Sequence, residues 1–95
     1  MTHAEEISAM MKSAGVNSID FVFSYNKPRI QREGITYEIF SIFAPDDGDT
    51  ELVLSARPTY NWRLVDLHMD ESWRESSWLK IRGIVEREIS KRAAW

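Results

Sequence analysis

A regular apolar stripe runs through the first fifteen residues of the chain. Apolar side chains recur at steps of three and four, at Ala4, Ile7, Met10, Met11 and Ala14. This spacing predicts an amphipathic helix. Thr2 and Glu5 have the spacing of a capping box, and Gly15 is suited to the left-handed position that closes a helix. We therefore expect a helix from the first residues to Ala14.

The next segment alternates between apolar and polar positions. Residues 18–25 place Ile19, Phe21, Phe23 and Tyr25 on one face, which predicts a strand with an aromatic face. Pro28 cannot donate to a ladder, so this strand is expected to end at residues 26–28. Residues 29–34 are polar and mostly basic, and they are interpreted as a connection.

Residues 35–44 form the longest stretch of β-branched and aromatic residues and predict a second strand. On a regular strand, one face carries Ile35, Tyr37, Ile39 and Phe43, and the other carries Phe40, Ile42 and Ala44. Both faces are apolar in the second half, which indicates a central strand covered on both sides. A turn at residues 45–49 leads into a third, antiparallel strand at residues 51–56.

The last third of the chain predicts one more strand and a helix. Residues 62–69 alternate and are taken as a fourth strand. Ser72 and Glu75 repeat the capping-box spacing, and a core-facing helical stripe follows at Trp78, Ile81, Val85 and Ile89. Gly83 lies opposite this stripe, inside the helix. The predicted fold is α+β, one domain over residues 1–95: an N-terminal helix, an antiparallel meander of three to four strands, and a C-terminal helix packed on the sheet.

Composition removes several classes of protein. The 95 residues are 43% hydrophobic and 28% charged, which is typical of a globular domain, and they contain no cysteine. A disulfide scaffold, a thiolate metal site and a cysteine nucleophile are therefore excluded. The longest nearly apolar stretch has six residues, whereas a membrane span needs about 20. The acidic N-terminal segment does not resemble a secretory signal, so we expect a soluble, cytoplasmic protein without a membrane partner.

Charge is distributed unevenly along the chain. The formal net charge is −3; residues 1–56 carry four bases and nine acids, and residues 57–95 carry eight bases and six acids. A nucleic-acid-binding domain is usually basic overall, so this balance favours another kind of partner. The C-terminal third is nevertheless expected to present a local basic surface.

No catalytic motif is present, and no cofactor or metal is expected. The nearest candidate is the trio His68, Asp70 and Glu71, whose side chains diverge on a regular backbone. The two acids of this trio, Asp70 and Glu71, are explained by the attraction of negative charge to the N-terminus of the last helix. The acidic sequence at residues 46–51 does not follow the spacing of a calcium-binding loop and is interpreted as a turn.

Two sets of side chains lie outside the predicted core and are candidates for partner binding. One is the acidic turn with Asp46, Asp47 and Asp49. The other is a basic set on the last helix, Lys80, Arg87 and Lys91, joined by Trp73 and Arg63. Tryptophan and arginine contribute most to interface hot spots, so the basic set is the preferred site.

These observations favour a small non-catalytic protein-binding module that acts by stoichiometric binding. Inhibitors of host enzyme complexes carried by phages or mobile elements, including anti-CRISPR proteins, have this general size and lack of motifs. The alternative is a nucleic-acid-binding module that uses the basic face of the last helix, together with the arginine and aromatic residues at 57–63. A small enzyme centred on His68 is the third hypothesis.

Overall fold

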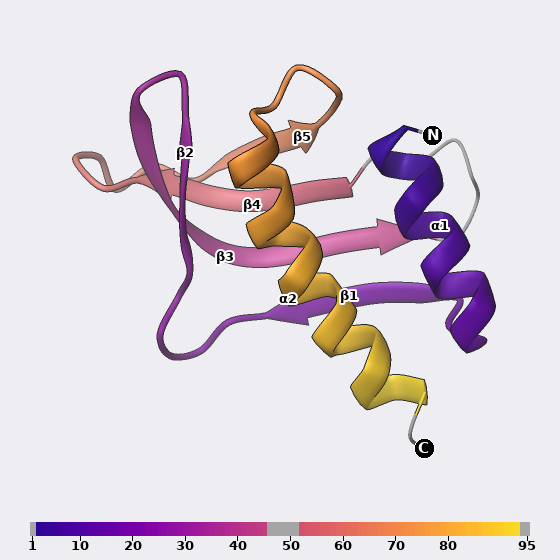
Figure 1. Ribbon diagram of the computed structural model, residues 1–95. Coiled ribbons are helices and arrows are strands. Elements are labelled where there is room, and N and C mark those ends of the chain that lie inside the picture. The colour runs from indigo at the N-terminus through magenta and orange to yellow at the C-terminus, as the bar shows by residue number, and fades with distance from the viewer. Residues whose placement is uncertain (1, 46–51, 94–95) are drawn as a thin grey trace.

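The chain folds as a sheet with two helices. The computed structural model describes residues 2–45 and 52–93 (Figure 1). The described elements, in chain order, are α1 (His3–Ala14), β1 (Ser18–Val22), β2 (Arg29–Arg32), β3 (Ile35–Pro45), β4 (Leu52–Pro58), β5 (Val65–Met69) and α2 (Glu75–Ala93). The α+β class and the order helix, antiparallel strands, helix are confirmed.

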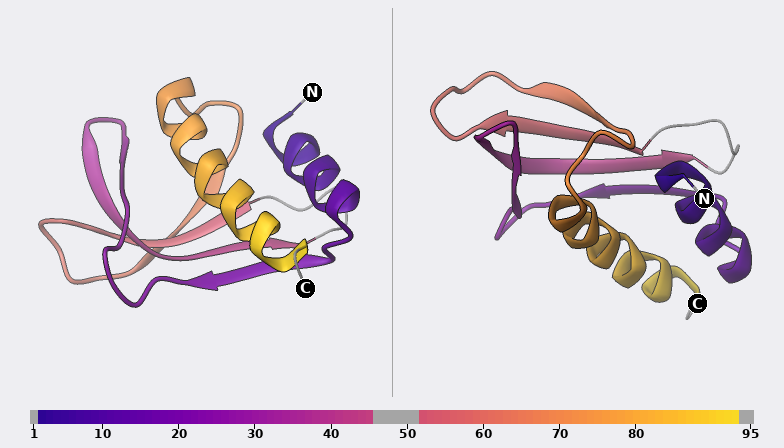
Figure 2. Two further views of the ribbon diagram at one scale, coloured as in Figure 1. Left: turned by 60° about the horizontal axis from the view of Figure 1, so that its bottom comes forward. Right: turned by 45° about the horizontal axis from the view of Figure 1, so that its top comes forward.

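The strands form one antiparallel sheet in the order β1-β3-β4-β5. β2 pairs with the first half of β3, and β1 pairs with its second half. Both helices lie on the same face of this sheet (Figure 2). β3 is therefore the central strand, as expected, but the expectation that it is covered on both sides is wrong. The helices shield one face, and no helix of the described residues lies on the other.

The first helix forms as its sequence predicts. The Thr2 hydroxyl accepts a hydrogen bond from the Glu5 backbone N–H at 3.1 Å, and Gly15 closes the helix with φ +71°. These contacts satisfy backbone groups that a helix end leaves without partners. Local sequence alone therefore fixes both ends of α1.

The interpretation of residues 29–34 as a connection is wrong, because they contain β2 and a tight turn. Arg29–Arg32 pairs with the start of β3 through a hairpin whose turn residues are Glu33 and Gly34. Both have positive φ, +52° and +80°, as a type I′ hairpin turn requires. Ile30 is the only apolar residue of the strand and is buried. A single apolar position cannot show a period of two, so the alternation was not visible in the sequence.

A bulge in β3 changes which side chains share a face. The register with β4 shifts between Ile39 and Ser41, which leaves Phe40 as the extra residue. Ile39 and Ile42 are consequently both buried, while Phe43 is 45% exposed. The predicted grouping of Phe43 with Ile39, and of Phe40 with Ile42, is therefore wrong, because one inserted residue inverts the alternation.

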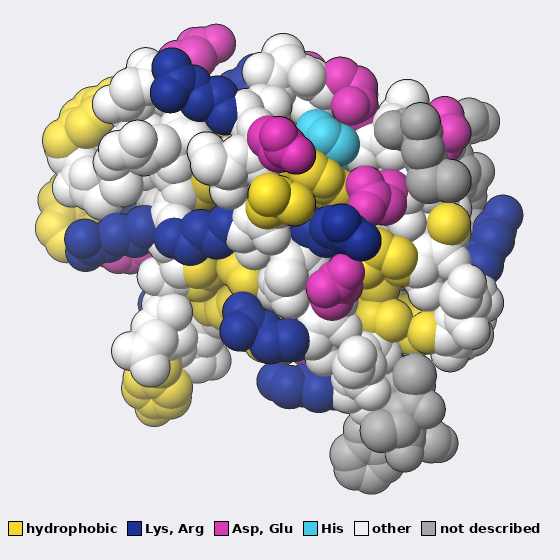
Figure 3. All heavy atoms as spheres, in the orientation of Figure 1, with side chains coloured by type: hydrophobic (Ala, Val, Ile, Leu, Met, Phe, Trp, Pro, Cys, Tyr) yellow, Lys and Arg dark blue, Asp and Glu magenta, His cyan; other side chains and the backbone are white. Residues whose placement is uncertain are grey.

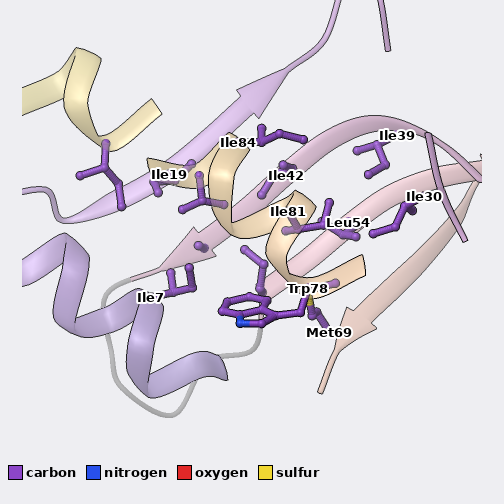
Figure 4. Packing of buried hydrophobic residues seen from close by; sticks show 14 of the residues in the cluster. Ile7, Ile19, Ile30, Ile39, Ile42, Leu54, Met69, Trp78, Ile81 and Ile84 are labelled. Carbon is purple, nitrogen blue, oxygen red and sulfur yellow. The ribbon is translucent and has the colours of Figure 1, made fainter. Parts of the chain in front are cut away.

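The core lies between the sheet and the helices. Trp78, Ile81 and Ile84 extend from α2 toward the sheet, which contributes Ile19, Ile39, Ile42 and Leu54 (Figure 4). The predicted α2 stripe is confirmed, because all four of its members are buried: Trp78, Ile81, Val85 and Ile89. Trp78 also stacks on the His3 ring of α1, with ring centroids 4.1 Å apart.

The segment before α2 differs from the prediction. The helix begins at Glu75, so Ser72 is not its cap. The Ser72 N–H and hydroxyl instead both donate to the Asp70 carboxylate. Trp73 precedes the helix and is 5% exposed, with its indole N–H donating to the His68 carbonyl at 3.0 Å.

Two predicted strands are shorter than expected. β1 ends at Val22, so Tyr25 lies in the following loop and is exposed rather than part of an aromatic face. β5 begins at Val65, and Trp62 lies in the preceding loop. Both aromatic residues therefore emerge from connections at the end of the sheet.

Candidate functional site

The helix-free face of the sheet carries a row of alternating cations and aromatic rings. The Lys27 ammonium lies 4.9 Å from the centre of the Phe40 ring, and the Arg57 guanidinium lies 5.1 Å from the same ring. The guanidinium also lies 4.7 Å from the centre of the Trp62 ring. At these distances a cation is attracted to the face of an aromatic ring, so the four side chains form a continuous series of cation–π contacts. We call Lys27, Phe40, Arg57 and Trp62 the cation–aromatic row.

Four different segments build this row. Glu38 and Arg57 are register partners on β3 and β4, directly beside the buried pair Ile39 and Ala56. Because side chains alternate along a strand, Glu38 and Arg57 must project from the helix-free face. The bulge adds Phe40 to that face, and Lys27 and Trp62 reach it from the two loops at the end of the sheet.

An ion pair fixes the central cation of the row. Arg57 Nη2 lies 3.1 Å from Glu38 Oε1, and both side chains are largely shielded from solvent. Partial burial makes such a pair stronger than a surface pair, and the flat guanidinium can stack on rings while its edge binds a carboxylate. Arg57 therefore offers the Trp62 ring a fixed cation to stack on, although Trp62 itself is 86% exposed.

The surrounding face is also apolar. Val22 and Phe43 project from it, at 66% and 45% exposure, and Val53 is half-buried beside Phe43. Tyr25 and Tyr60 are exposed in the loops that border the row. Exposed aromatic and aliphatic groups that lie together, rather than singly, mark interaction surfaces on soluble proteins.

The predicted basic residues of the last helix form a second surface. Lys80, Arg87 and Lys91 are exposed on the flank of α2 that faces β1 and β2. The Lys80 ammonium donates to the Arg29 carbonyl of β2, and the Lys91 ammonium lies 5.8 Å from the centre of the Phe21 ring of β1. We call Arg29, Lys80, Arg87 and Lys91 the basic flank. Lys and Arg side chains extend over this part of the helix-bearing face (Figure 3).

The other predicted members of the basic set do not join this flank. Trp73 is buried, and the Arg32 guanidinium covers its ring at 4.3 Å. Trp73 is thus a core residue and not an exposed anchor, which corrects the sequence-based assignment. Arg63 lies in the β4–β5 loop at the far end of the sheet from the C-terminal half of α2 (Figures 1 and 2). Asp46, Asp47 and Asp49 lie outside the described residues.

The trio His68, Asp70 and Glu71 does not converge on one point. The sequence suggested that Glu71 lies at the N-terminus of α2. Its carboxylate instead accepts a hydrogen bond from the His3 backbone N–H, at the N-terminus of α1. The hydroxyl and N–H of Ser72 both donate to the Asp70 carboxylate and lower the pKa of Asp70. Among the residues that the structure describes, no three metal-binding side chains gather.

A groove of about 520 Å³ separates the two helices. It is lined on the α1 side by Glu6 and Met10 and on the α2 side by Glu86 and Ile89. Arg82 bridges its two acids, at 3.0 Å from Glu6 and 3.3 Å from Glu86. This ion-pair network joins the helices, so the groove has a structural explanation.

Within the part of the chain that the structure describes, neither helix is long and apolar enough to cross a bilayer.

Comparison with models of protein families, with curated proteins and with solved structures finds no match to this chain. Sequence reasoning had noted the mixture of arginine and aromatic residues at 57–63, which includes Arg57 and Trp62. It missed Phe40, because the bulge that turns Phe40 outward depends on strand pairing. It missed Lys27 as well, because this side chain joins the row only through its contact with Phe40.

Proposed function

We propose that this protein is a non-catalytic protein-binding module that acts by stoichiometric binding, with the helix-free face of the sheet as its contact surface. The observation that carries this proposal is the Trp62 ring, which is 86% exposed and lies 4.7 Å from the guanidinium of the ion-paired Arg57. An aromatic side chain has only two rotatable bonds, so it loses little conformational entropy when a partner buries it. Tryptophan, tyrosine and arginine are also the residues that dominate binding hot spots.

Charge favours a protein over a nucleic acid at this face. Arg57 is already neutralised by Glu38, and Asp20 and Asp66 project from the same face. A polyanion would meet these carboxylates without enough free cations to balance them. A protein partner can instead cover the apolar side chains and leave the ion pair intact. An inhibitor of an enzyme complex, such as those that phages and mobile elements carry, would use a surface in this way.

The proposal is tested by capture with matched variants. Immobilised wild-type protein, Trp62→Ser and Leu79→Ser are exposed to lysate, and bound proteins are quantified by mass spectrometry. Leu79 is the control because it is 50% exposed on α2, away from the sheet face. We expect at least one protein to be retained by the wild type and by Leu79→Ser but lost with Trp62→Ser.

The captured protein is then purified and titrated by calorimetry. We expect a 1:1 complex that Trp62→Ser weakens about thirtyfold, which corresponds to the ~2 kcal/mol typical of a hot spot. Circular dichroism confirms that each variant is folded. Proteins retained equally by all three forms, or a bound fraction that consists of nucleic acid, would show that this face is not the contact surface.

A further inference from the structure

The basic flank borders a pocket with an aromatic floor. The pocket measures about 300 Å³ and lies between β1, the residues that follow it, and α2; it is lined by Phe21, Phe23, Ile84, Arg87, Glu88 and Lys91. The two phenylalanine rings meet edge to face, with centroids 4.6 Å apart. Together with Ile84 they form an apolar floor large enough for one side chain.

The rim of this pocket is positively charged. Arg87 and Lys91 are exposed at its edge, one turn of α2 apart. Among the described residues that line the pocket, Glu88 is the only acid, and Arg92 binds it, with Arg92 Nε 3.0 Å from Glu88 Oε1. Glu88 is therefore neutralised within the fold, and the charge that the rim presents to a ligand is that of Arg87 and Lys91.

Positive charge continues along the same flank. Lys80 lies two turns before Arg87, and its ammonium reaches the edge of β2 beside Arg29. A ligand that crosses the flank thus meets an apolar pocket with cations on its rim and two more cations further along. An extended segment with one large apolar side chain and several carboxylates matches this arrangement in both shape and charge.

We infer that the basic flank binds an acidic protein segment whose large apolar side chain enters the pocket formed by Phe21, Phe23 and Ile84. This site lies on the helix-bearing side of the molecule and does not depend on the helix-free face proposed above. The charge of the whole chain favours a protein segment over a nucleic acid, because a formal net charge of −3 opposes the approach of a long polyanion more than that of a short acidic segment.

The test uses a defined probe and variants of equal charge. A fluorescent heptapeptide with a central phenylalanine, flanked by three aspartates on each side, is titrated with the protein at low ionic strength. Two further peptides carry serine in place of the phenylalanine or asparagine in place of the aspartates. We expect the first peptide to bind with a dissociation constant below about 1 mM, and each altered peptide to bind at least about tenfold more weakly.

The variant Arg87→Glu/Lys91→Glu reverses the charge of the rim, and Lys12→Glu/Arg63→Glu makes the same change in net charge elsewhere. All four side chains are exposed, so both variants should fold. We expect the rim variant to weaken peptide binding at least about tenfold and the control to change it less than about threefold. Trp62→Ser should bind the peptide as the wild type does, so this result separates the two proposed surfaces.

Several outcomes would overturn the inference. No binding of the phenylalanine peptide to the wild type would show that the pocket does not recognise this chemistry. Equal binding of the serine peptide, or equal losses in both charge variants, would reduce the interaction to general electrostatic attraction. Tighter binding of an oligothymidylate probe, lost in the rim variant, would make the flank a nucleic-acid site instead.

Discussion

Replacing Gly83 with alanine is expected to stabilise this protein. Gly83 lies inside α2, and a Cβ atom built on it meets no atom of the described residues within 4 Å. Glycine in a helix interior is 0.8–1.0 kcal/mol less favourable than alanine, because it loses more backbone entropy on folding. With no clash to offset this gain, we expect stability to rise by about 1 kcal/mol. For a domain of this size that corresponds to an increase in Tm of roughly 4–8 °C.

Gly34→Ala is the matched control. Its Cβ would also meet no described atom within 4 Å, but Gly34 has φ +80° in the β2–β3 turn. An L-residue in the left-handed region costs about 1–2 kcal/mol, so this variant should lose stability. The two substitutions add the same methyl group to equally open sites. The sign of the effect should therefore follow the backbone conformation alone.

Urea unfolding monitored by tryptophan fluorescence measures both variants, with linear extrapolation of the free energy of unfolding. Equal m-values would show that the two-state comparison is valid. If Gly83→Ala leaves stability unchanged or lowers it while Gly34→Ala lowers it as expected, the reasoning fails at Gly83. Either the backbone there would not be a regular helix, or another group would cover that position.

Trp78→Ala should lower the free energy of unfolding by about 3–5 kcal/mol, because Trp78 is 4% exposed and stacks on His3. The neighbouring control Leu79→Ala, half exposed, should cost far less, and similar losses in urea unfolding would remove Trp78 from the core. Asp70 has a lowered pKa in the folded state, mainly through the Ser72 hydroxyl and N–H, so its stabilising effect is present above the ordinary pKa of about 3.9 and is lost as pH falls through the lower folded value. Asp70→Asn should therefore show a flatter decline of stability with acid than the wild type, and superimposable acid-unfolding curves would contradict this assignment.

The sequence by itself determined the elements whose signals are local. Thr2, Glu5 and Gly15 mark both ends of α1 through contacts within a few residues of each other. The core stripe of α2 and the long strand at residues 35–45 were likewise predictable, because burial on one side leaves a periodic trace in the sequence. The positions of Lys80, Arg87 and Lys91 on one flank of α2 follow from the same helical period.

Tertiary structure alone decided which surfaces these elements create. The bulge at Phe40 arises from the pairing of β3 with β4, and it turns Phe40 toward Arg57 instead of the core. Trp73 lies just before α2, but it is buried because the β2–β3 hairpin brings Arg32 over its ring. Neither outcome has a signal within a few residues of the side chain concerned.

The difference between the two groups is one of distance along the chain. Caps and helical stripes depend on neighbours three or four residues away, so the local sequence is enough to predict them. The cation–aromatic row joins Lys27, Phe40, Arg57 and Trp62, which meet only after the strands have paired. Strand register therefore decides which aromatic residues this protein buries and which it presents to a partner.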